Sequence, residues 1–283
     1  MVLVQDKDSR PVEVRGRNLL IRLAESAEEI EASQRLRYRV FVEEMAAEAT
    51  EARRESGREF DAYDDFCEHL LVFDLDRCAA AQGDAAGVVG TYRFMRRTQA
   101  ATAGGFYTAG EYDIAKLEAV DGEILEVGRS CIDSAYRDGA TIQLLWKGIS
   151  AYVFHYDVAY LFGCASLPSV DPDALAVPLS FLFHNHLAPE DLRVRALPEL
   201  YVDMNRLPAE SIDRREAQKA LPPLLKGYLR LGGFVGDGAV VDRDFGTTDV
   251  CLILKTDWAS DRYRKHYTRE SQGRGGKGDK GDG

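Results

Sequence analysis

Apolar residues gather most densely between positions 124 and 165, and their spacing changes along this stretch. An apolar, β-branched run at 124–132 predicts a strand, and a polar turn follows at 133–139. Apolar positions at 142–149 then have the i, i+3, i+4, i+7 spacing of a helix. A second apolar run at 159–165 predicts a buried strand. A strand, a helix and a strand of these lengths imply a parallel pair joined by a right-handed crossover.

Further elements on both sides of this unit predict an α/β fold, with a mixed central sheet flanked by helices. Ser26 followed by Glu29 has the pattern of a capping box, in which two side chains satisfy free backbone amides at the start of a helix. The same reasoning predicts strands at 18–24, 69–75, 88–95, 235–241 and 249–255, and helices at 30–42, 114–119, 141–156 and 222–231.

The predicted elements also divide the chain. We expect a polar lead-in at 1–17, one domain at 18–268 with a mainly helical insert at about 168–220, and a disordered Gly/Lys/Asp tail at 269–283.

The strand at 124–132 carries two opposite charges, Glu126 and Arg129, at a spacing of three. In a regular strand they would point to opposite faces of the sheet. Gly128 lies between them, and a β-bulge there would reset the alternation and place both side chains on one face. We expect a binding site at such a bulge. The simpler alternative is a pair of solvated surface charges.

Composition narrows the function classes. The formal net charge of −11 argues against general affinity for nucleic acid, and the chain has no apolar run of the roughly 18 residues that span a membrane. Five scattered cysteines without a CxxC pair indicate reduced, buried thiols and a cytoplasmic protein. His184 and His186 have metal-like spacing, but no further His or Cys cluster lies nearby, so we expect no metal.

A set of separate residues gives a more specific indication. Arg37 stands four before Phe41, Asp61 stands three before Asp64, and Arg93, Glu126 and Arg129 follow in that order. The order of elements resembles the GNAT acyltransferase fold, and this residue set resembles that of acyl-homoserine lactone synthases. In the GNAT family the bulged strand and the following loop hold a pantetheine thioester. Here that loop would be Arg137-Asp-Gly-Ala-Thr. Residues 42–52 lack the tryptophan that the lactone synthases place there.

Longer stretches resemble the bacterial ornithine N-acyltransferases of ornithine-lipid synthesis. They are Glu126-Val-Gly-Arg-Ser-Cys-Ile-Asp, Asp138-Gly-Ala-Thr-Ile-Gln-Leu-Leu-Trp, Leu161-Phe-Gly-Cys-Ala-Ser-Leu, Pro222-Pro-Leu-Leu-Lys-Gly-Tyr-Leu-Arg-Leu-Gly-Gly and Asp242-Arg-Asp-Phe-Gly-Thr-Thr-Asp249. This resemblance implies transfer of a 3-hydroxyacyl chain from acyl carrier protein to the α-amino group of L-ornithine, which gives lyso-ornithine lipid. It implies no bound cofactor, since the donor is the acyl-phosphopantetheine of the carrier.

The resemblance also implies roles for individual residues. Glu126 would act as general base, or only order a loop by pairing with Arg129 or Arg93, and Arg129 would share the catalytic site. Asp61 and Asp64 would hold the ammonium groups of ornithine, or form an ordinary turn. The other expected substrate-binding residues are Arg37, Phe41, Arg93 and Phe106. The residues expected to bind the carrier or its phosphopantetheine are Arg96, Arg97, Arg137 and Gly139.

Two other functions remain open on the same fold. One is a signal synthase like the lactone synthases, or an N-acetyltransferase that uses acetyl-CoA. The other is a protein that binds the carrier without catalysis. The apolar helix at 175–183 would cover the acyl chain, contact the inner membrane or simply pack in the core. Tyr228 lies near the position of a thiol-protonating tyrosine in GNAT enzymes, although a core role is the alternative.

Overall fold

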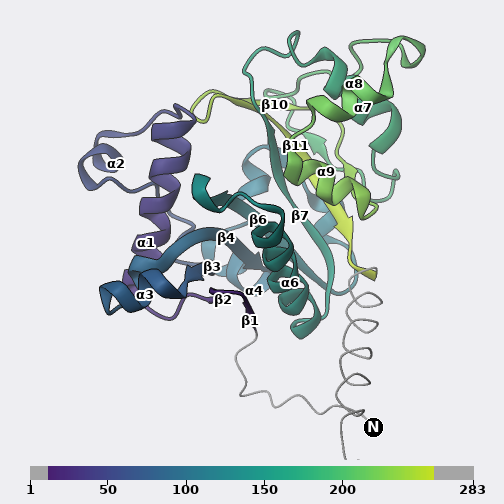
Figure 1. Ribbon diagram of the computed structural model, residues 1–283. Helices are drawn as coiled ribbons and strands as arrows, with labels where there is room; N and C mark the ends of the chain where they lie inside the picture. Colours follow the sequence, from purple (N-terminus) through teal and green to yellow (C-terminus); the bar gives the residue numbers. More distant parts are fainter. Residues whose placement is uncertain (1–11, 258–283) are drawn as a thin grey trace, which may run out of the picture.

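A nine-stranded mixed sheet forms the centre of the computed structural model, which describes residues 12–257 (Figure 1). The strand order is β1-β2-β3-β4-β6-β7-β11-β10, and β9 pairs with β11. The strands are β1 (Glu13–Gly16), β2 (Leu19–Leu23), β3 (Glu68–Asp74), β4 (Val88–Arg96), β6 (Glu123–Ile132), β7 (Val158–Leu167), β9 (Phe234–Val235), β10 (Val240–Asp242) and β11 (Thr247–Lys255). A separate small ladder joins β5 (Tyr112–Asp113) to β8 (Arg195–Ala196).

Only β6 and β7 form a parallel pair among these strands, and α6 (Gly139–His155) connects them. This is the predicted crossover unit, so that prediction is confirmed. The remaining helices are α1 (Ala27–Arg37), α2 (Glu51–Ser56), α3 (Leu75–Ala81), α4 (Arg97–Ala103), α5 (Ala115–Glu118), α7 (Ala176–His186), α8 (Arg214–Ala220) and α9 (Pro223–Arg230). The last three gather beside β10 and β11 in Figure 1.

Alternating side chains give the sheet two apolar faces. On β2, Ile21 belongs to the cluster that α6 covers, whereas its neighbour Leu20 belongs to the cluster that α1 covers. A third cluster, which contains Ile124 and Phe162, lies under α4 and α5. Because Ile124 and Leu125 are neighbours in β6 and face opposite sides, this third cluster shares the α1 face of the sheet. The charged residues described below lie between the two clusters of that face.

The first helix begins as the sequence predicts and ends differently. The Ser26 hydroxyl accepts a hydrogen bond from the amide of Glu29, which caps α1. After Arg37 the chain continues as a π-helix, η1 (Tyr38–Glu44), where the prediction had one continuous helix. π-Helical turns are rare and occur often at functional sites.

The predicted polar lead-in needs correction. Residues 13–16 of the predicted lead-in pair with β2 as strand β1, because Val14 and Gly16 lie half-buried against the sheet. Between the predicted strands at 69–75 and 88–95 lies a short helix, α3, which Asp74 caps with its carboxylate. The predicted tail at 269–283 lies outside the described residues, as does the end of the predicted domain from 258 to 268.

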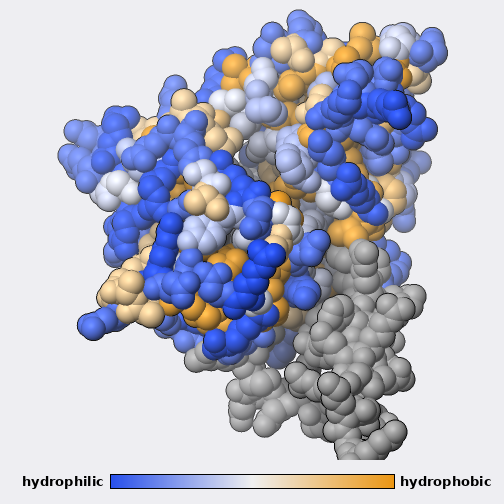
Figure 2. Space-filling view, viewed as in Figure 1, coloured by the Kyte–Doolittle hydropathy of each residue, from blue (hydrophilic) through white to orange (hydrophobic). Residues whose placement is uncertain are grey.

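The surface visible in Figure 2 is mostly hydrophilic, with apolar side chains in limited patches. In the part of the chain from 12 to 257, no helix combines the length and apolar character needed to cross a bilayer.

Candidate active site

Strands β6 and β7 separate halfway along their length. Their parallel pairing runs from Glu123 opposite Val158 to Glu126 opposite Phe162, although both strands continue beyond these residues. Where the pairing stops, the residues of both strands change from buried to half-buried, at 128–130 and 164–165. We call this opening between two central strands the fork. Because its edges carry free backbone groups, the fork can accept a ligand between the strands.

A β-bulge lies on the β6 side of the fork, one residue beyond the predicted position. Thr91 and Arg93 of β4 face Cys131 and Gly128 of β6, so Arg129 and Ser130 together lie opposite a single residue. Arg129 has a φ of 52°, in the left-handed region, whereas Gly128 does not. The prediction of a bulge is confirmed, but its placement at Gly128 is wrong. The strained residue is therefore an arginine. Its side chain is held in place by contacts with residues outside the strand.

Those contacts belong to a buried network of three arginines and three carboxylates. Its members are Arg37, Arg93, Arg129, Glu59, Asp61 and Asp64. Arg93 contacts Asp61 at 2.6 Å and Asp64 at 3.1 Å. Arg129 contacts Asp61 at 3.1 Å and Glu59 at 3.4 Å. Arg37 contacts Glu59 at 2.8 Å and holds Asp64 by two bonds of 2.8 and 2.5 Å. The network therefore joins α1, the turn before β3, β4 and the bulge.

The arginines determine how the aspartates titrate. Burial alone would raise the pKa of Asp64, but Arg37 and Arg93 outweigh it and hold the pKa far below its usual range. Burial opposes a low pKa at Asp61 too, and the charges of Arg93 and Arg129 again outweigh it. Both carboxylates are therefore ionised and neutralised by arginine. Asp64 is also only 4% exposed, so its predicted contact with ornithine would require the network to open.

Aromatic rings enclose the bulge arginine. The guanidinium of Arg129 lies 4.8 Å from the ring centre of Tyr107 and 4.6 Å from that of Phe245. Phe41 packs edge-on against Phe245 at 5.6 Å. Phe41, a predicted substrate-binding residue, is 9% exposed and packs against Phe245, the ring that contacts Arg129. Rings on both sides desolvate the Arg129 cation and strengthen its ion pairs.

Glu126, the predicted base, holds a loop. One carboxylate oxygen accepts the amide of Tyr107 at 3.0 Å, and the other accepts the amide of Thr108 at 2.6 Å. The side chain is 6% exposed, and burial raises its pKa although the amide hydrogen bonds oppose this. Of the two interpretations of Glu126, this geometry favours the one in which Glu126 orders a loop. It does so by accepting backbone amides, and not through the expected ion pair with Arg129 or Arg93. Phe106, next to this loop, is buried against Phe162 at 5.1 Å.

The four residues predicted to bind the carrier lie in two places. Arg96 is paired with Leu125 in β6, whereas Arg137 and Gly139 follow the far end of that strand. At about 3.3 Å per residue, the two groups are roughly 20 Å apart. Arg97 donates to the carbonyl oxygens of residues 118, 120 and 122 and so fixes a loop. Arg96 contacts Glu68 and lies 3.8 Å from the ring centre of Tyr156. The four residues therefore do not form one cluster, and their contact with the carrier stays a prediction.

Arg137 instead belongs to an exposed group of arginines at the start of α6. Arg39 and Arg77 both approach Asp133, at 4.0 and 3.6 Å, and Arg137 contacts Glu44 at 2.5 Å. The side chains of Arg39, Arg77 and Arg137 are 47%, 45% and 45% exposed. We call these three residues the arginine rim.

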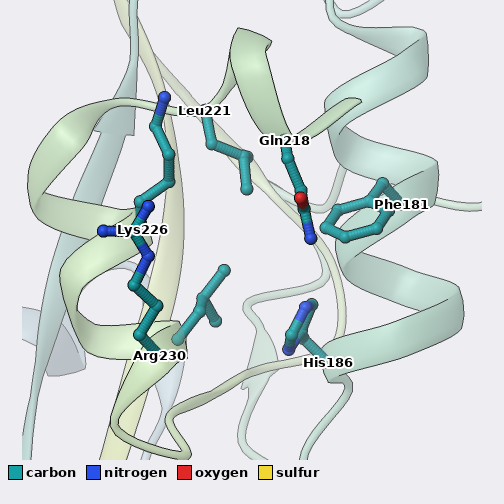
Figure 3. A pocket seen from close by; sticks show the side chains of 7 residues that line it. Phe181, His186, Gln218, Leu221, Lys226 and Arg230 are labelled. Atoms are coloured by element: carbon teal, nitrogen blue, oxygen red, sulfur yellow. The ribbon is translucent and has the colours of Figure 1, made fainter. Parts of the chain in front are cut away.

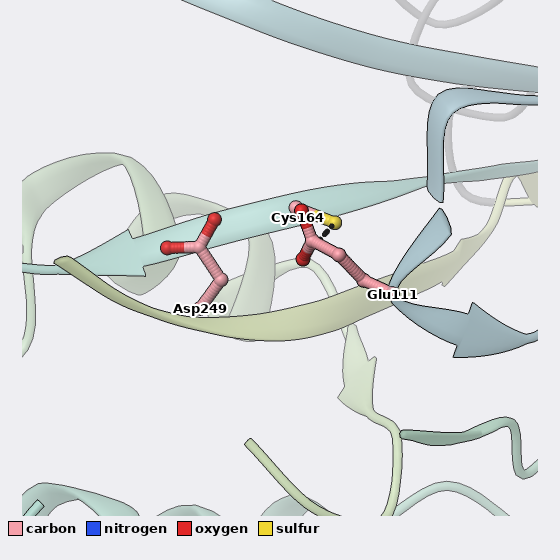
Figure 4. Close-up of side chains that lie close together, drawn as sticks. All are labelled: Glu111, Cys164 and Asp249. Atoms are coloured by element: carbon pink, nitrogen blue, oxygen red, sulfur yellow. Dashed lines mark hydrogen bonds between the residues drawn. The ribbon is translucent and has the colours of Figure 1, made fainter. Parts of the chain in front are cut away.

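A second titratable cluster lies at the β7 edge of the fork. Ligand atoms of Glu111, Cys164 and Asp249 lie within 4.8 Å of one another. Figure 4 shows Glu111 reaching from its loop to Cys164, with Asp249 on the neighbouring strand. The Cys164 thiol donates to Glu111 at 3.2 Å. Three donors without a histidine are one fewer than the four protein ligands of a structural zinc site. Burial raises the pKa of the thiol well above its usual value.

The insert contributes a separate pocket of about 270 Å³ between α7, α8 and α9. Figure 3 shows Lys226 and Arg230 along one side, with His186 and Phe181 across from them. Phe181 belongs to the apolar cluster on the α6 face, so the pocket does not open on the ion network. The helix predicted at 175–183 has Phe181 and its neighbours in the core, as the simpler interpretation expected.

Tyr228 is a core residue. Its hydroxyl forms a hydrogen bond with that of Tyr92 at 2.7 Å, and both rings are buried.

Sequence reasoning missed Glu59, Tyr107, Phe245, Glu111 and Asp249. Phe245 and Asp249 lie in the quoted stretch at 242–249, but no spacing along the chain assigns them to the site, because tertiary contacts bring all five residues there.

Known proteins are similar to this chain in sequence and in fold. Residues 36–147 match the model of an acetyltransferase (GNAT) domain. An L-ornithine N(alpha)-acyltransferase of Brucella abortus (strain 2308) is 46% identical over 256 residues, which are 90% of each chain. That of Rhodobacter capsulatus is 45% identical over 90% of this chain and 96% of its own. Among solved structures, the AHL synthase LasI aligns over 86% of this chain and 92% of its own, with 12% identity and a TM-score of 0.41. The identity to the acyltransferases extends over nearly the whole chain, and on this ground the protein belongs to the family of L-ornithine N(alpha)-acyltransferases, built on the GNAT fold.

Proposed function

We propose that this protein transfers a 3-hydroxyacyl chain from acyl carrier protein to the α-amino group of L-ornithine. The product is lyso-ornithine lipid, and the reaction is the first step of ornithine lipid synthesis. The observation that carries the proposal is identity of about 45% over nine-tenths of the chain to proteins named for this acyl transfer to ornithine. The fork and the bulge of the site support it, since an acyl thioester can enter between the separated strands.

The arginine rim supports a protein as the donor. The whole chain has a formal charge of −11, yet three half-exposed arginines surround the segment that leads into α6. Asp133 and Glu44 approach them, but the three guanidinium groups stay half-exposed and can contact an acidic partner. An acidic carrier and the phosphate of its phosphopantetheine would be steered to the exposed guanidinium groups of this surface.

The ion network would form the floor beneath the acceptor. Asp61 is the most exposed of its three carboxylates, at 16% of the side chain, so it is the one that can contact an ammonium group. We assign Arg37, Arg93 and Asp64 to positioning this floor, and Arg129 to the edge that borders the fork. We expect the enzyme to act in the cytoplasm and to deliver its product at the inner membrane.

A mixed-acceptor assay tests the function directly. Purified protein is incubated with 3-hydroxyacyl carrier protein and a mixture of ornithine, lysine, glutamine, glycine and a homoserine-type acceptor, and the products are identified by mass spectrometry. We expect acyl-ornithine. A lactone or another acyl-amine as the main product would contradict the acceptor assignment. Carrier binding without any product would favour a non-catalytic protein.

A charge reversal tests the donor. We expect Arg77→Glu to raise the KM for acyl carrier protein several-fold and to leave the rate with a short acyl-pantetheine unchanged, because the small donor does not reach the rim. Arg215→Glu in α8 is the matched control, since it reverses an exposed arginine elsewhere. An equal effect of both variants on the KM for the carrier would argue against docking at the rim.

A further inference from the structure

Glu111 is a half-buried carboxylate and Asp249 a buried one, and neither has a cation in direct contact within residues 12–257. Among residues 12–257 neither forms an ion pair with a lysine or an arginine, whereas Asp61 is paired with two arginines. Asp249 is 5% exposed and accepts only hydroxyl groups, with Thr247 at 2.9 Å. Glu111 is half-buried and accepts the thiol of Cys164. Desolvation of a carboxylate without an opposite charge favours its protonated form.

The titration of the two groups reflects this setting. Burial raises the pKa of Glu111 to about 7, and the nearby carboxylate of Asp249 adds to the effect. Burial raises the pKa of Asp249 to about 6, against the hydroxyl hydrogen bonds that lower it. The pair therefore exchanges a proton near neutral pH, where a proton acceptor works best. The other titratable or charged groups that face the pair are Tyr107, Tyr112, Arg129, Cys164, Asp242 and Cys251.

The position of the pair is the second part of the argument. Cys164 lies two residues beyond Phe162, the last residue of β7 that pairs with β6, and therefore borders the fork. Its sulfur connects Glu111, at 3.2 Å, to the hydroxyl of Thr108, at 3.8 Å. The amide of Thr108 in turn binds Glu126. The pair thus adjoins the loop that Glu126 holds, at the point where the sheet opens.

The other carboxylates near the fork are less suited to accept a proton. Each oxygen of Glu126 already accepts a backbone amide. Asp61 and Asp64 have pKa values held low by arginines, so they bind a proton too weakly at neutral pH. Glu59 is 1% exposed and contacts Arg37 and Arg129, so it is not accessible to an amine. Of these carboxylates, Glu111 combines partial exposure, proximity to the fork and a pKa near neutrality.

We propose that Glu111, coupled to Asp249, is the group that contacts the acceptor amine and takes its proton, and that Glu126 positions the loop carrying Glu111. This assignment rests on the proposed acyl transfer to an amine. The ammonium first loses one proton to the pair, which releases it to solvent. The nitrogen lone pair then forms the C–N bond at the thioester carbonyl as the C–S bond breaks. Glu111 takes the second nitrogen proton and gives it to the departing thiolate, so the products are an amide and a thiol.

The variant Glu111→Gln tests the assignment in two stages, beginning with titration alone. A pKa raised on folding makes the carboxyl contribute stability at low pH that is lost as the pH rises from its unfolded value, about 4.3, through about 7. We expect urea unfolding of the wild type to show this loss between about pH 4 and pH 7, and Glu111→Gln to show a smaller loss, because Asp249, whose pKa is also raised, to about 6, is still present. Glu118→Gln, an exposed neighbour, should behave like the wild type.

The second stage measures the rate. We expect Glu111→Gln to lose at least roughly 10²-fold in kcat, and to lose the limb of kcat/KM that rises near pH 7. Glu111→Asp should recover part of the rate. Wild-type rate and pH profile in Glu111→Gln would overturn the assignment. Absence of acyl transfer by the wild type would contradict the proposed function instead, and the titration stage would still report on the pair.

Asp249→Asn decides the question if Glu111→Gln does not fold. Removal of the neighbouring negative charge lowers the pKa of Glu111, so the rising limb should move to lower pH. A limb that stays in place would overturn the coupling of the pair to the reaction.

Discussion

Arg37 offers the most direct test of the ion network. Its side chain is fully buried, with 0% exposure, and it contacts the carboxylates of both Asp64 and Glu59. Arg37→Met keeps the length and the apolar stem of the side chain and removes the charge. The change leaves Asp64 with Arg93 at 3.1 Å as its remaining cation. Glu59 then keeps only Arg129 at 3.4 Å and Arg53 at 3.8 Å.

The expected loss of stability in Arg37→Met follows from these contacts. Arg53 also lies 3.8 Å from Glu59, so the variant does not leave a bare charge, but it removes the shortest cation contact of both Glu59 and Asp64. Removal of one partner from a buried ion pair destabilises a protein by about 3–5 kcal/mol. A typical domain is stable by about 5–15 kcal/mol, so Arg37→Met should fold but unfold at a much lower denaturant concentration. Arg37→Lys should lie between, because an ammonium group cannot form the two parallel bonds to Asp64.

Urea unfolding followed by circular dichroism measures the difference. The matched control is Arg35→Met in the same helix, where the arginine pairs with Glu31 at 3.3 Å on the surface. Exposed pairs at this spacing contribute about 0.3–0.5 kcal/mol, so the control should be nearly as stable as the wild type. If Arg37→Met were destabilised by no more than the control, the network would not be the buried, interdependent unit described here.

Two other predictions concern acid and the fork. Despite the opposing effect of burial, Arg37 and Arg93 lower the pKa of Asp64, so its contribution to stability is present above about pH 4 and is lost as the pH falls. The urea midpoint of the wild type should therefore fall more steeply than that of Arg37→Met between about pH 5 and pH 3, and parallel curves would contradict this. At the fork, a methyl group on Gly163 would lie 2.1 Å from the carbonyl oxygen of Val127. Gly163→Ala should cost about 1–3 kcal/mol and lower activity, whereas Gly128→Ala, which meets nothing within 4 Å, should match the wild type in thermal unfolding and rate.

The sequence was sufficient to predict the core of the fold. Apolar spacing predicted β6, α6 and β7 in the right order, because these elements bury their apolar faces over many residues. The capping of α1 by Ser26 was also predictable, since it depends only on neighbouring residues. The bulge was placed one residue early because glycine is the residue that adopts a positive φ most easily. Ion pairs to Asp61 and Glu59 hold Arg129 there, and no local pattern shows such contacts.

Only part of the candidate site was predicted, because local patterns do not show tertiary contacts. Arg37, Asp61, Asp64, Arg93 and Arg129 do meet, but they bind one another, which spacing along the chain cannot indicate. Glu111 and Asp249 are 138 positions apart, and they meet because Asp249 lies on β11, paired directly with the strand of Cys164. That register depends on the whole sheet.

The balance of the ion network restricts how the protein can evolve. Each of its six members contacts two members of opposite charge, so a change in one residue removes an ion pair from two others. Single substitutions at these positions are therefore costly. Descendant sequences should either keep all six residues or replace an arginine together with a carboxylate. Across many relatives, these positions should covary in pairs of opposite charge. Such covariation would reveal contacts that a single sequence does not show.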